Sequence, residues 1–257
     1  MASPAVRVFE HNIYVYRRTW RGTLFQTFLT PVLFLAAMGL GLGGLIDRQA
    51  GAALGGVPYM VFLAPGLLAA QAMQTAAFEN TFPVMAKTTW LKTYDAMLAT
   101  PLRVRDLILG DLGWSATRLV IVAAAFLVVM AVFGAVRSPS ALLAIPAAAL
   151  TGFAFAAPIF AFSATQRNVT LFNALFRFGI TPLFLFSGTF FPVDRLPAII
   201  QPVAYVTPLY HGVSLTRGLS LGTLDTAAGL IHVAVLAAFS IGGVVAGAYT
   251  LRRRLVK

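Results

Sequence analysis

The 257-residue chain contains no cysteine and only three histidines, so the usual side chains of metal and thiol chemistry are scarce. Without cysteine it can form no disulfide and offers no thiolate, either as a metal ligand or as a nucleophile. His11, His211 and His232 are far apart in the sequence, and His232 lies in an apolar run, where a packed or hydrogen-bonded ring is expected. The sequence therefore predicts no metal site.

Catalytic signatures are missing as well. A phosphate-binding loop needs glycines followed by lysine and serine or threonine. None of Lys87, Lys92 and Lys257 follows a glycine, and neither an HExxH nor a GxSxG motif occurs. We therefore expect no catalytic residue and no cofactor in this chain. On the same grounds we do not expect the chain to hydrolyse ATP by itself.

Apolar residues dominate what is present. They make up 59% of the chain, and the mean hydropathy is +0.83, which excludes an ordinary soluble domain. A helix crosses a bilayer core of roughly 30 Å with about 20 residues. Apolar runs of adequate length lie near residues 24–46, 58–82, 108–134, 141–163, 172–188 and 226–250. We predict an all-α membrane protein, a single domain over 1–257 with six transmembrane helices.

The net charge of +11 is unevenly distributed along these runs. If the N-terminus is cytoplasmic, fourteen lysines and arginines fall in inner segments, four in outer segments and Arg118 within a span. The inner cations are Arg7, Arg17, Arg18, Arg21, Lys87, Lys92, Arg103, Arg105, Arg167, Arg177, Arg252, Arg253, Arg254 and Lys257, and the outer ones are Arg48, Arg137, Arg195 and Arg217. This bias predicts a cytoplasmic (inner) membrane protein with both termini in the cytoplasm. Anionic membrane lipids, rather than nucleic acid, account for the basicity.

An amphipathic pattern precedes the first apolar run. Val6, Phe9, Ile13, Tyr16 and Trp20 repeat at steps of three and four residues, whereas the arginines fall elsewhere on the helical wheel. The pattern indicates an interfacial helix over 6–22, with aromatic side chains at the inner membrane surface. The alternative is a basic tail with a chance periodicity.

The segment 190–212 is apolar but interrupted by Pro192, Pro197, Pro202 and Pro208. Proline removes backbone donors and breaks helices, and lipid cannot satisfy the backbone groups that are freed. Such a segment survives at membrane depth only when it is buried in protein or lines a cavity. We predict short re-entrant helices before the last span, a shape typical of transport proteins.

The segment 84–106, between the second and third runs, is mixed in composition. Pro83 is predicted to end the second span, and Leu91, Tyr94 and Leu98 then repeat at helical spacing. A short amphipathic helix on the cytoplasmic side is a plausible docking element for a soluble partner. The alternative is a solvated connector.

Two ionisable residues, Glu79 and Arg118, fall inside predicted spans. A charge at that depth costs about 2.5–3.5 kcal/mol on insertion scales, so each needs a partner. We expect the two to face one another across antiparallel helices, either fixing helix register or taking part in gating. Most aromatic residues of 172–191 are expected to pack, and a minority to line an apolar path. The residues assigned to a translocation path or gate are Glu79, Arg118, Phe172, Phe176, Phe190 and Phe191.

Four segments together carry a family resemblance. They are FLAPGLLAAQAM at 62–73, YDAMLATPL at 94–102, SGTFFPVDRLP at 187–197 and PLYHGVSLTRG at 208–218. With them the chain resembles the membrane permeases of ABC-2 type exporters, most of all permeases for nodulation-type lipooligosaccharides and then antibiotic exporters. The resemblance implies a dimer of this subunit with two separate ATPase subunits, which would bind ATP and Mg²⁺. It also implies coupling to the ATPases through the connector, for which we choose Lys87, Leu91, Tyr94, Asp95 and Leu98.

The leading hypothesis is thus a permease subunit that exports an amphipathic substrate: a lipid, a glycolipid or a hydrophobic drug. One alternative is an ion-coupled secondary carrier, which the scarcity of acidic groups within the spans disfavours. Another alternative is a membrane scaffold that transports nothing.

Overall fold

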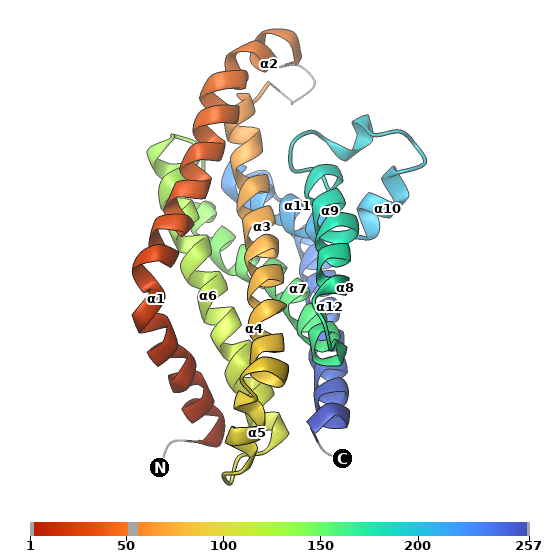
Figure 1. Ribbon diagram of the computed structural model, residues 1–257. Coiled ribbons are helices and arrows are strands. Elements are labelled where there is room, and N and C mark those ends of the chain that lie inside the picture. Colours follow the sequence, from red (N-terminus) through yellow and green to blue (C-terminus); the bar gives the residue numbers. More distant parts are fainter. Residues whose placement is uncertain (1–2, 51–55, 256–257) are drawn as a thin grey trace.

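The computed structural model describes residues 3–50 and 56–255, and within these ranges every regular element is a helix. The all-α prediction is confirmed. The long helices run side by side as a bundle, and both chain ends lie at the same end of it (Figure 1). Lys257, counted above among the inner cations, lies outside the described residues.

Five helical segments of the described ranges are long and apolar enough to cross a membrane. They are Pro4–Arg48, Tyr59–Trp90, Val104–Val132, Pro139–Thr165 and Thr226–Leu255. The sixth predicted span corresponds to Thr170–Phe186, which is apolar but shorter. It consists of α8 (Thr170–Ala174), a π-helical stretch (Leu175–Ile180) and α9 (Thr181–Phe186).

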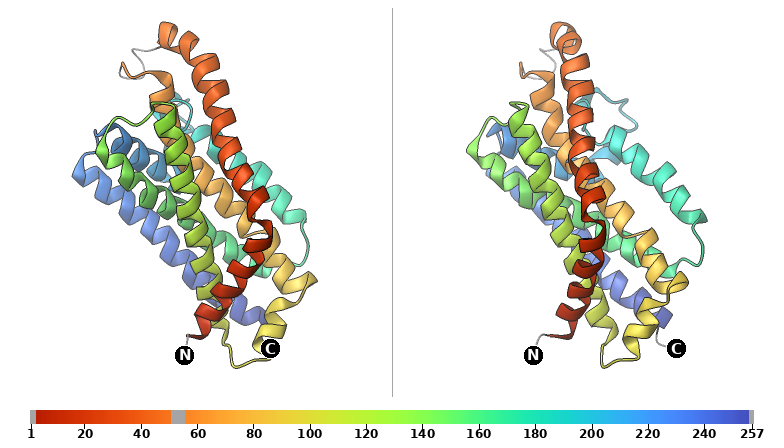
Figure 2. Two further views of the ribbon diagram at one scale, coloured as in Figure 1. Left: turned by 90° about the vertical axis from the view of Figure 1, so that its left-hand side faces the viewer. Right: turned by 60° about the vertical axis from the view of Figure 1, so that its left-hand side comes forward.

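The N-terminal helix is longer than the sequence pattern indicates. α1 (Pro4–Phe34) continues through a π-helical stretch (Leu35–Leu42) into α2 (Gly43–Ala50), and it runs along the bundle beside α6 (Figure 2). The predicted boundary between an interfacial helix at 6–22 and a span at 24–46 is therefore absent. Gly22 is the weakest helix former at that point, and its cost of about 1 kcal/mol does not end a packed helix.

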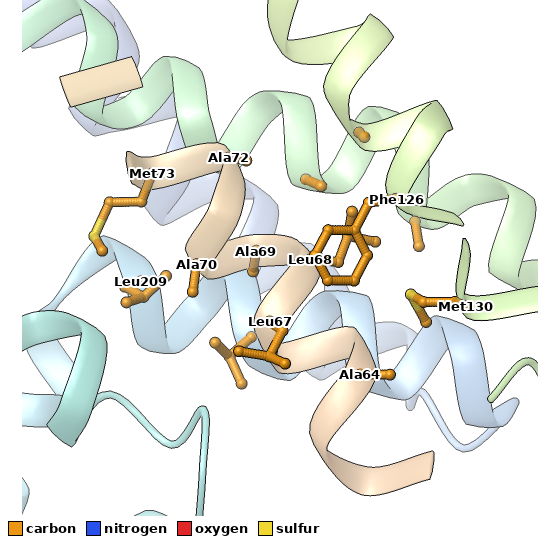
Figure 3. Packing of buried hydrophobic residues seen from close by; sticks show 14 of the residues in the cluster. Ala64, Leu67, Leu68, Ala69, Ala70, Ala72, Met73, Phe126, Met130 and Leu209 are labelled. Carbon is orange, nitrogen blue, oxygen red and sulfur yellow. The ribbon is translucent and has the colours of Figure 1, made fainter. Parts of the chain in front are cut away.

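α3 (Tyr59–Glu79) forms the centre of the bundle and buries most of its length. Figure 3 shows its closely spaced alanines and leucines among side chains of α6 (Val104–Val132) and α11 (Pro208–Leu221). The alanines allow these neighbours to approach on several sides, so α3 stays partly open only along the side that carries Gln71, Gln74 and Phe78. Because α3 is held by its neighbours in this core, its orientation determines where each of its polar side chains lies.

The connector after α3 differs from its prediction. Pro83 does not end the second span; it lies in the first turn of α4 (Phe82–Met85), where no amide donor is needed. A π-helical stretch (Ala86–Trp90) follows, and Lys92 then adopts a left-handed backbone (φ 49°) before α5 (Thr93–Leu98). The break at Lys92 separates Leu91 from Tyr94, so the expected stripe of Leu91, Tyr94 and Leu98 is not one helix face.

α7 (Ala144–Thr165) follows the 3₁₀ turn Pro139–Leu143, and it packs closely against the last helix, α12 (Thr226–Leu255). Gly243 of α12 meets the ring of Pro158: a Cβ atom at this glycine would lie only 2.4 Å from the proline Cδ. Glycine is therefore required at this crossing, because any larger residue would separate the two helices.

Beyond α9 the chain turns back at the end of the bundle away from the termini (Figure 1). It forms a single 3₁₀ turn (Val193–Arg195), α10 (Gln201–Val206) and then α11, which packs on α3 and α7. α11 extends to Leu221, nine residues past the predicted limit at 212. Pro208 begins this helix rather than breaking it, because proline is tolerated in a first turn.

Candidate functional site

A buried polar cluster joins the connector to two long helices. We name it the Asp111 cluster; its members are Asn12 of α1, Lys87 and Tyr94 of the connector, and Asp111 of α6. Asp111 is only 5% exposed. Its Oδ1 accepts hydrogen bonds from Lys87 Nζ at 2.7 Å and from Asn12 Nδ2 at 2.7 Å. Its Oδ2 accepts a hydrogen bond from the Tyr94 hydroxyl.

The cluster contains one positive group, Lys87, and one negative group, Asp111, and these two and Asn12 are all hydrogen-bonded to one another. Lys87 Nζ also donates to Asn12 Oδ1 at 2.8 Å, so three segments distant in sequence share one network. Burial, and next the Asp111 carboxylate, raise the pKa of Tyr94 well above its usual value, which keeps the hydroxyl a donor near neutral pH. These hydrogen bonds therefore tie the connector to both α1 and α6.

The structure divides the predicted coupling residues into two groups. Leu91 (73% exposed) and Asp95 lie on the surface, where a partner can touch them. Tyr94 is completely buried, and Leu98 packs against the same apolar core as Tyr94. Direct contact with a partner is open to Leu91 and Asp95, whereas Lys87 and Tyr94 belong to the buried network behind them.

The expected contact between Glu79 and Arg118 is confirmed. Arg118 Nε donates to Glu79 Oε1 at 2.8 Å, and the Arg118 side chain is 4% exposed. Its Nη1 also donates to the Tyr16 hydroxyl at 3.1 Å, and the guanidinium lies 4.7 Å from the centre of the Tyr16 ring. Tyr16 completes this site from α1, which no spacing in the sequence indicates.

Glu79→Gln is expected to lower the free energy of unfolding by about 1–3 kcal/mol, because the buried Arg118 then lacks a counter-charge. The amide keeps one acceptor and almost the same volume, so the loss measures charge rather than packing. Thermal unfolding of the purified chain in detergent checks this, with Glu10→Gln on the exposed face of α1 as the control. Equal midpoints for the two variants would contradict it.

The predicted path aromatics do not form one lining. Phe172 is completely buried and meets the edges of Phe82 and Phe162, as a packing residue does. Phe176 stacks on Phe78 of α3, with ring centres 4.6 Å apart, and Phe78 is 56% exposed.

The remaining two aromatics lie after α9. Phe190 is half-buried against Phe184, with ring centres 5.0 Å apart, whereas Phe191 is exposed. Of the four predicted aromatics, Phe176 therefore lies beside a partly open surface of α3, and this surface includes Phe78, which the sequence analysis does not single out.

Arg217 joins three of the four segments that carry the family resemblance. Its Nε donates to the Phe62 carbonyl at 3.0 Å, and its Nη2 donates to the carbonyls of Gly188 at 2.8 Å and Thr189 at 3.3 Å. The guanidinium also lies 3.7 Å from the centre of the Phe62 ring. The charge count places Arg217 in an outer connector, but it is a half-buried group of α11 that holds the loop after α9 against α3.

Gly66 is required at the same place. A Cβ atom there would lie 2.9 Å from Arg217 Nη2 and 3.0 Å from the Thr189 carbonyl oxygen. Beside it, the Thr216 hydroxyl donates to the Pro65 carbonyl at 2.9 Å. The proline–glycine pair of α3 therefore serves close approach of α11 and the loop, which explains why these short motifs occur together.

Comparison of the sequence with known proteins identifies a family and several relatives. Residues 7–221 match the family model described as ABC-2 type transporter. Nodulation protein J of Rhizobium leguminosarum bv. trifolii is 33% identical over 254 residues, which cover 98% of this chain and 94% of the relative. Nodulation protein J of Rhizobium meliloti (strain 1021) is 30% identical over 251 residues, with 98% and 94% covered.

A more distant relative carries a transport name. The inner membrane transport permease YadH of Escherichia coli (strain K12) is 23% identical over 241 residues, with 91% of each chain covered. The family model spans most of the chain, from α1 to the end of α11, and includes the Asp111 cluster and Arg217. The chain therefore belongs to the ABC-2 type transporter family of membrane proteins.

Proposed function

We propose that this chain is the permease subunit of an ATP-driven exporter that moves an amphipathic molecule out across the cytoplasmic membrane. Lipids, glycolipids or lipooligosaccharides, and hydrophobic drugs are the substrate classes. Family membership supports the permease role and implies association with an ABC ATPase. The likeness to a relative named as an inner membrane transport permease supports transport across the cytoplasmic membrane.

In this proposal two copies of the subunit enclose the path, and two separate ATPase subunits bind ATP and Mg²⁺. Residues 170–186 supply the sixth crossing, and the segment after α9 re-enters from the outer side. The excess of inner cations and the position of both termini at one end of the bundle support cytoplasmic termini (Figure 1).

The observation that carries the proposal is the connector at that same end. It exposes the side chains of Trp90, Leu91 and Asp95, and the same segment contributes Lys87 and Tyr94 to the Asp111 cluster. A partner that presses on this surface displaces Tyr94 and Lys87, and through Asp111 and Asn12 it displaces α6 and α1. ATP-driven closure of the partner subunits would thus alter the helix bundle.

Leu91→Asp is expected to reduce permease-stimulated ATP hydrolysis about tenfold or more, because a charge replaces an apolar anchor in the docking surface. The measurement uses the permease reconstituted with its ATPase, in the presence and absence of substrate. The matched control is Leu142→Asp, which alters an equally exposed leucine at the other end of the bundle.

Full stimulation by the Leu91→Asp variant would refute the coupling role of the connector. Gradient-driven uptake by the chain alone would favour the secondary carrier. Complete absence of transport and of substrate-stimulated hydrolysis with the partner present would favour a scaffold.

A further inference from the structure

A polar groove lies between α1 and the pair α3 and α6, at a depth where most side chains are apolar. Its central part has a volume of about 220 Å³. We define the polar groove by Thr23, Thr27 and Thr30 of α1 and by Gln71 and Gln74 of α3. Gln71 lies within the family segment 62–73, but the sequence analysis assigns no role to any of these five residues.

The groove continues at both ends. Towards the Asp111 cluster it joins a second space of about 230 Å³, with which it shares Thr23, Glu79 and Arg118. In the other direction it reaches Phe34 and Phe184, past Thr30 and the two glutamines. A polar lining therefore extends along α3 from the connector end into the middle of the bundle.

Helical spacing explains how the lining forms. The three threonines are separated by four and three residues, and the glutamines by three, so each set lies on one face of its helix. The hydroxyl of Thr23 donates to the Thr19 carbonyl at 3.2 Å, and that of Thr27 donates to the Thr23 carbonyl at 2.7 Å. Their oxygens keep lone pairs with which they can accept hydrogen bonds.

The glutamines are the strongest indication of a ligand. Within the described part of the chain, the half-buried amides of Gln71 and Gln74 form no hydrogen bond. Each amide provides two donor hydrogens and an acceptor oxygen, and these groups stay open to the groove because both side chains are only half-buried. Both amides therefore have donors and an acceptor to offer to water or to a bound polar group.

The charges around the groove indicate which polar group fits. Arg118 is already paired with Glu79, and Lys87 with Asp111, so neither cation is available to an anionic head group. Hydroxyl and amide groups on opposite walls suit a neutral ligand rich in hydrogen-bonding groups. Phe78, stacked on Phe176 at the rim, offers an apolar surface for an attached hydrocarbon chain.

We propose that the polar groove binds the uncharged, hydroxyl- and amide-bearing head group of the transported amphipath, with the chemistry of a saccharide. This inference rests on the proposed function, since it assigns a site to the exported molecule. The path would then begin within one subunit, between α1 and α3, and the hydrocarbon part would lie towards Phe78.

Binding to the full-length chain in lipid nanodiscs tests this site. The probes are three photoreactive amphipaths with the same alkyl chain and different head groups: maltoside, phosphate or trimethylammonium. The maltoside probe is expected to bind most tightly to the wild-type chain. Gln71→Leu combined with Gln74→Leu should weaken it about 10- to 100-fold, the effect of losing two hydrogen-bonding side chains.

The controls remove the same groups elsewhere. Thr117→Val and Gln166→Leu alter side chains outside the groove that are hydrogen-bonded to the carbonyls of Gly113 and Phe162. They should leave maltoside binding unchanged. Gln71→Glu separates a local effect from a folding defect. Its new negative charge should weaken maltoside binding but increase trimethylammonium binding, whereas a misfolded variant would lose the binding of both probes.

Unchanged maltoside affinity in the double glutamine variant would overturn the proposal, and so would tighter phosphate binding by the wild-type chain. Hydrolysis assays with the ATPase separate this result from the proposed function. If the permease stimulates ATP hydrolysis normally but the double glutamine variant binds maltoside as the wild type does, only the groove proposal is refuted. If maltoside binding depends on the glutamines but neither ATPase stimulation nor transport is detected, the groove proposal stands and the exporter proposal is refuted.

Discussion

Arg217→Met is expected to lower the free energy of unfolding by about 3–5 kcal/mol, because the buried carbonyls of Phe62, Gly188 and Thr189 lose a charged donor together. Methionine fills much of the space, so the loss reflects hydrogen bonds rather than a cavity. The measurement is thermal unfolding of the purified chain in detergent, together with the yield of folded protein.

Two further variants define this result. Arg217→Lys should fall between methionine and the wild type, because a single ammonium cannot reproduce the fork of a guanidinium. Arg195→Met removes an exposed arginine close to the same loop and should change stability by less than about 0.5 kcal/mol. If the Arg217→Met and Arg195→Met variants have the same thermal unfolding midpoint, Arg217 does not hold the loop to α3.

Asp111→Leu should be destabilising to a similar degree, by about 3–5 kcal/mol, because it leaves the half-buried Lys87 without its counter-charge. Asn12 and Tyr94 lose their acceptor in the same substitution. Thermal unfolding is again the measurement, and proteolysis of the connector reports whether α5 detaches.

A second substitution tests the cause. Lys87→Met added to Asp111→Leu should restore part of the stability, because both charges are then absent. Asp95→Leu is the control: this exposed carboxylate of α5 is expected to affect hydrolysis in the partner but not unfolding. A double variant less stable than Asp111→Leu alone would show that Lys87 stabilises the chain by some other contact.

Features that depend on local sequence are well predicted. The all-α class and the position of the long helices follow from apolar runs, because a bilayer sets their length. The pairing of Glu79 with Arg118 also follows, since two isolated charges in apolar surroundings need each other. In both cases one physical requirement, the bilayer thickness or the need of a buried charge for a partner, restricts the structure to few arrangements.

Features that depend on neighbouring helices are not predicted. The sequence predicts that Pro83 ends a helix, whereas in the structure it lies in the first turn of one. Proline is compatible with both positions, so the sequence alone does not distinguish them. Arg217 was counted as an outer cation, because its three carbonyl acceptors come from segments far away in the sequence. The helix orientation that turns Gln71 towards α1 likewise has no local signature.

The contact of Gly243 with Pro158 has a consequence for motion. Because backbone and ring are in such close contact, we expect α7 and α12 to move together when the protein changes conformation. If the chain alternates between inward-open and outward-open forms, the relative movement of helices is then expected on the opposite side of the bundle. There hydroxyls, amides and open volume lie between α1 and α3, which leaves these two helices space to shift against each other.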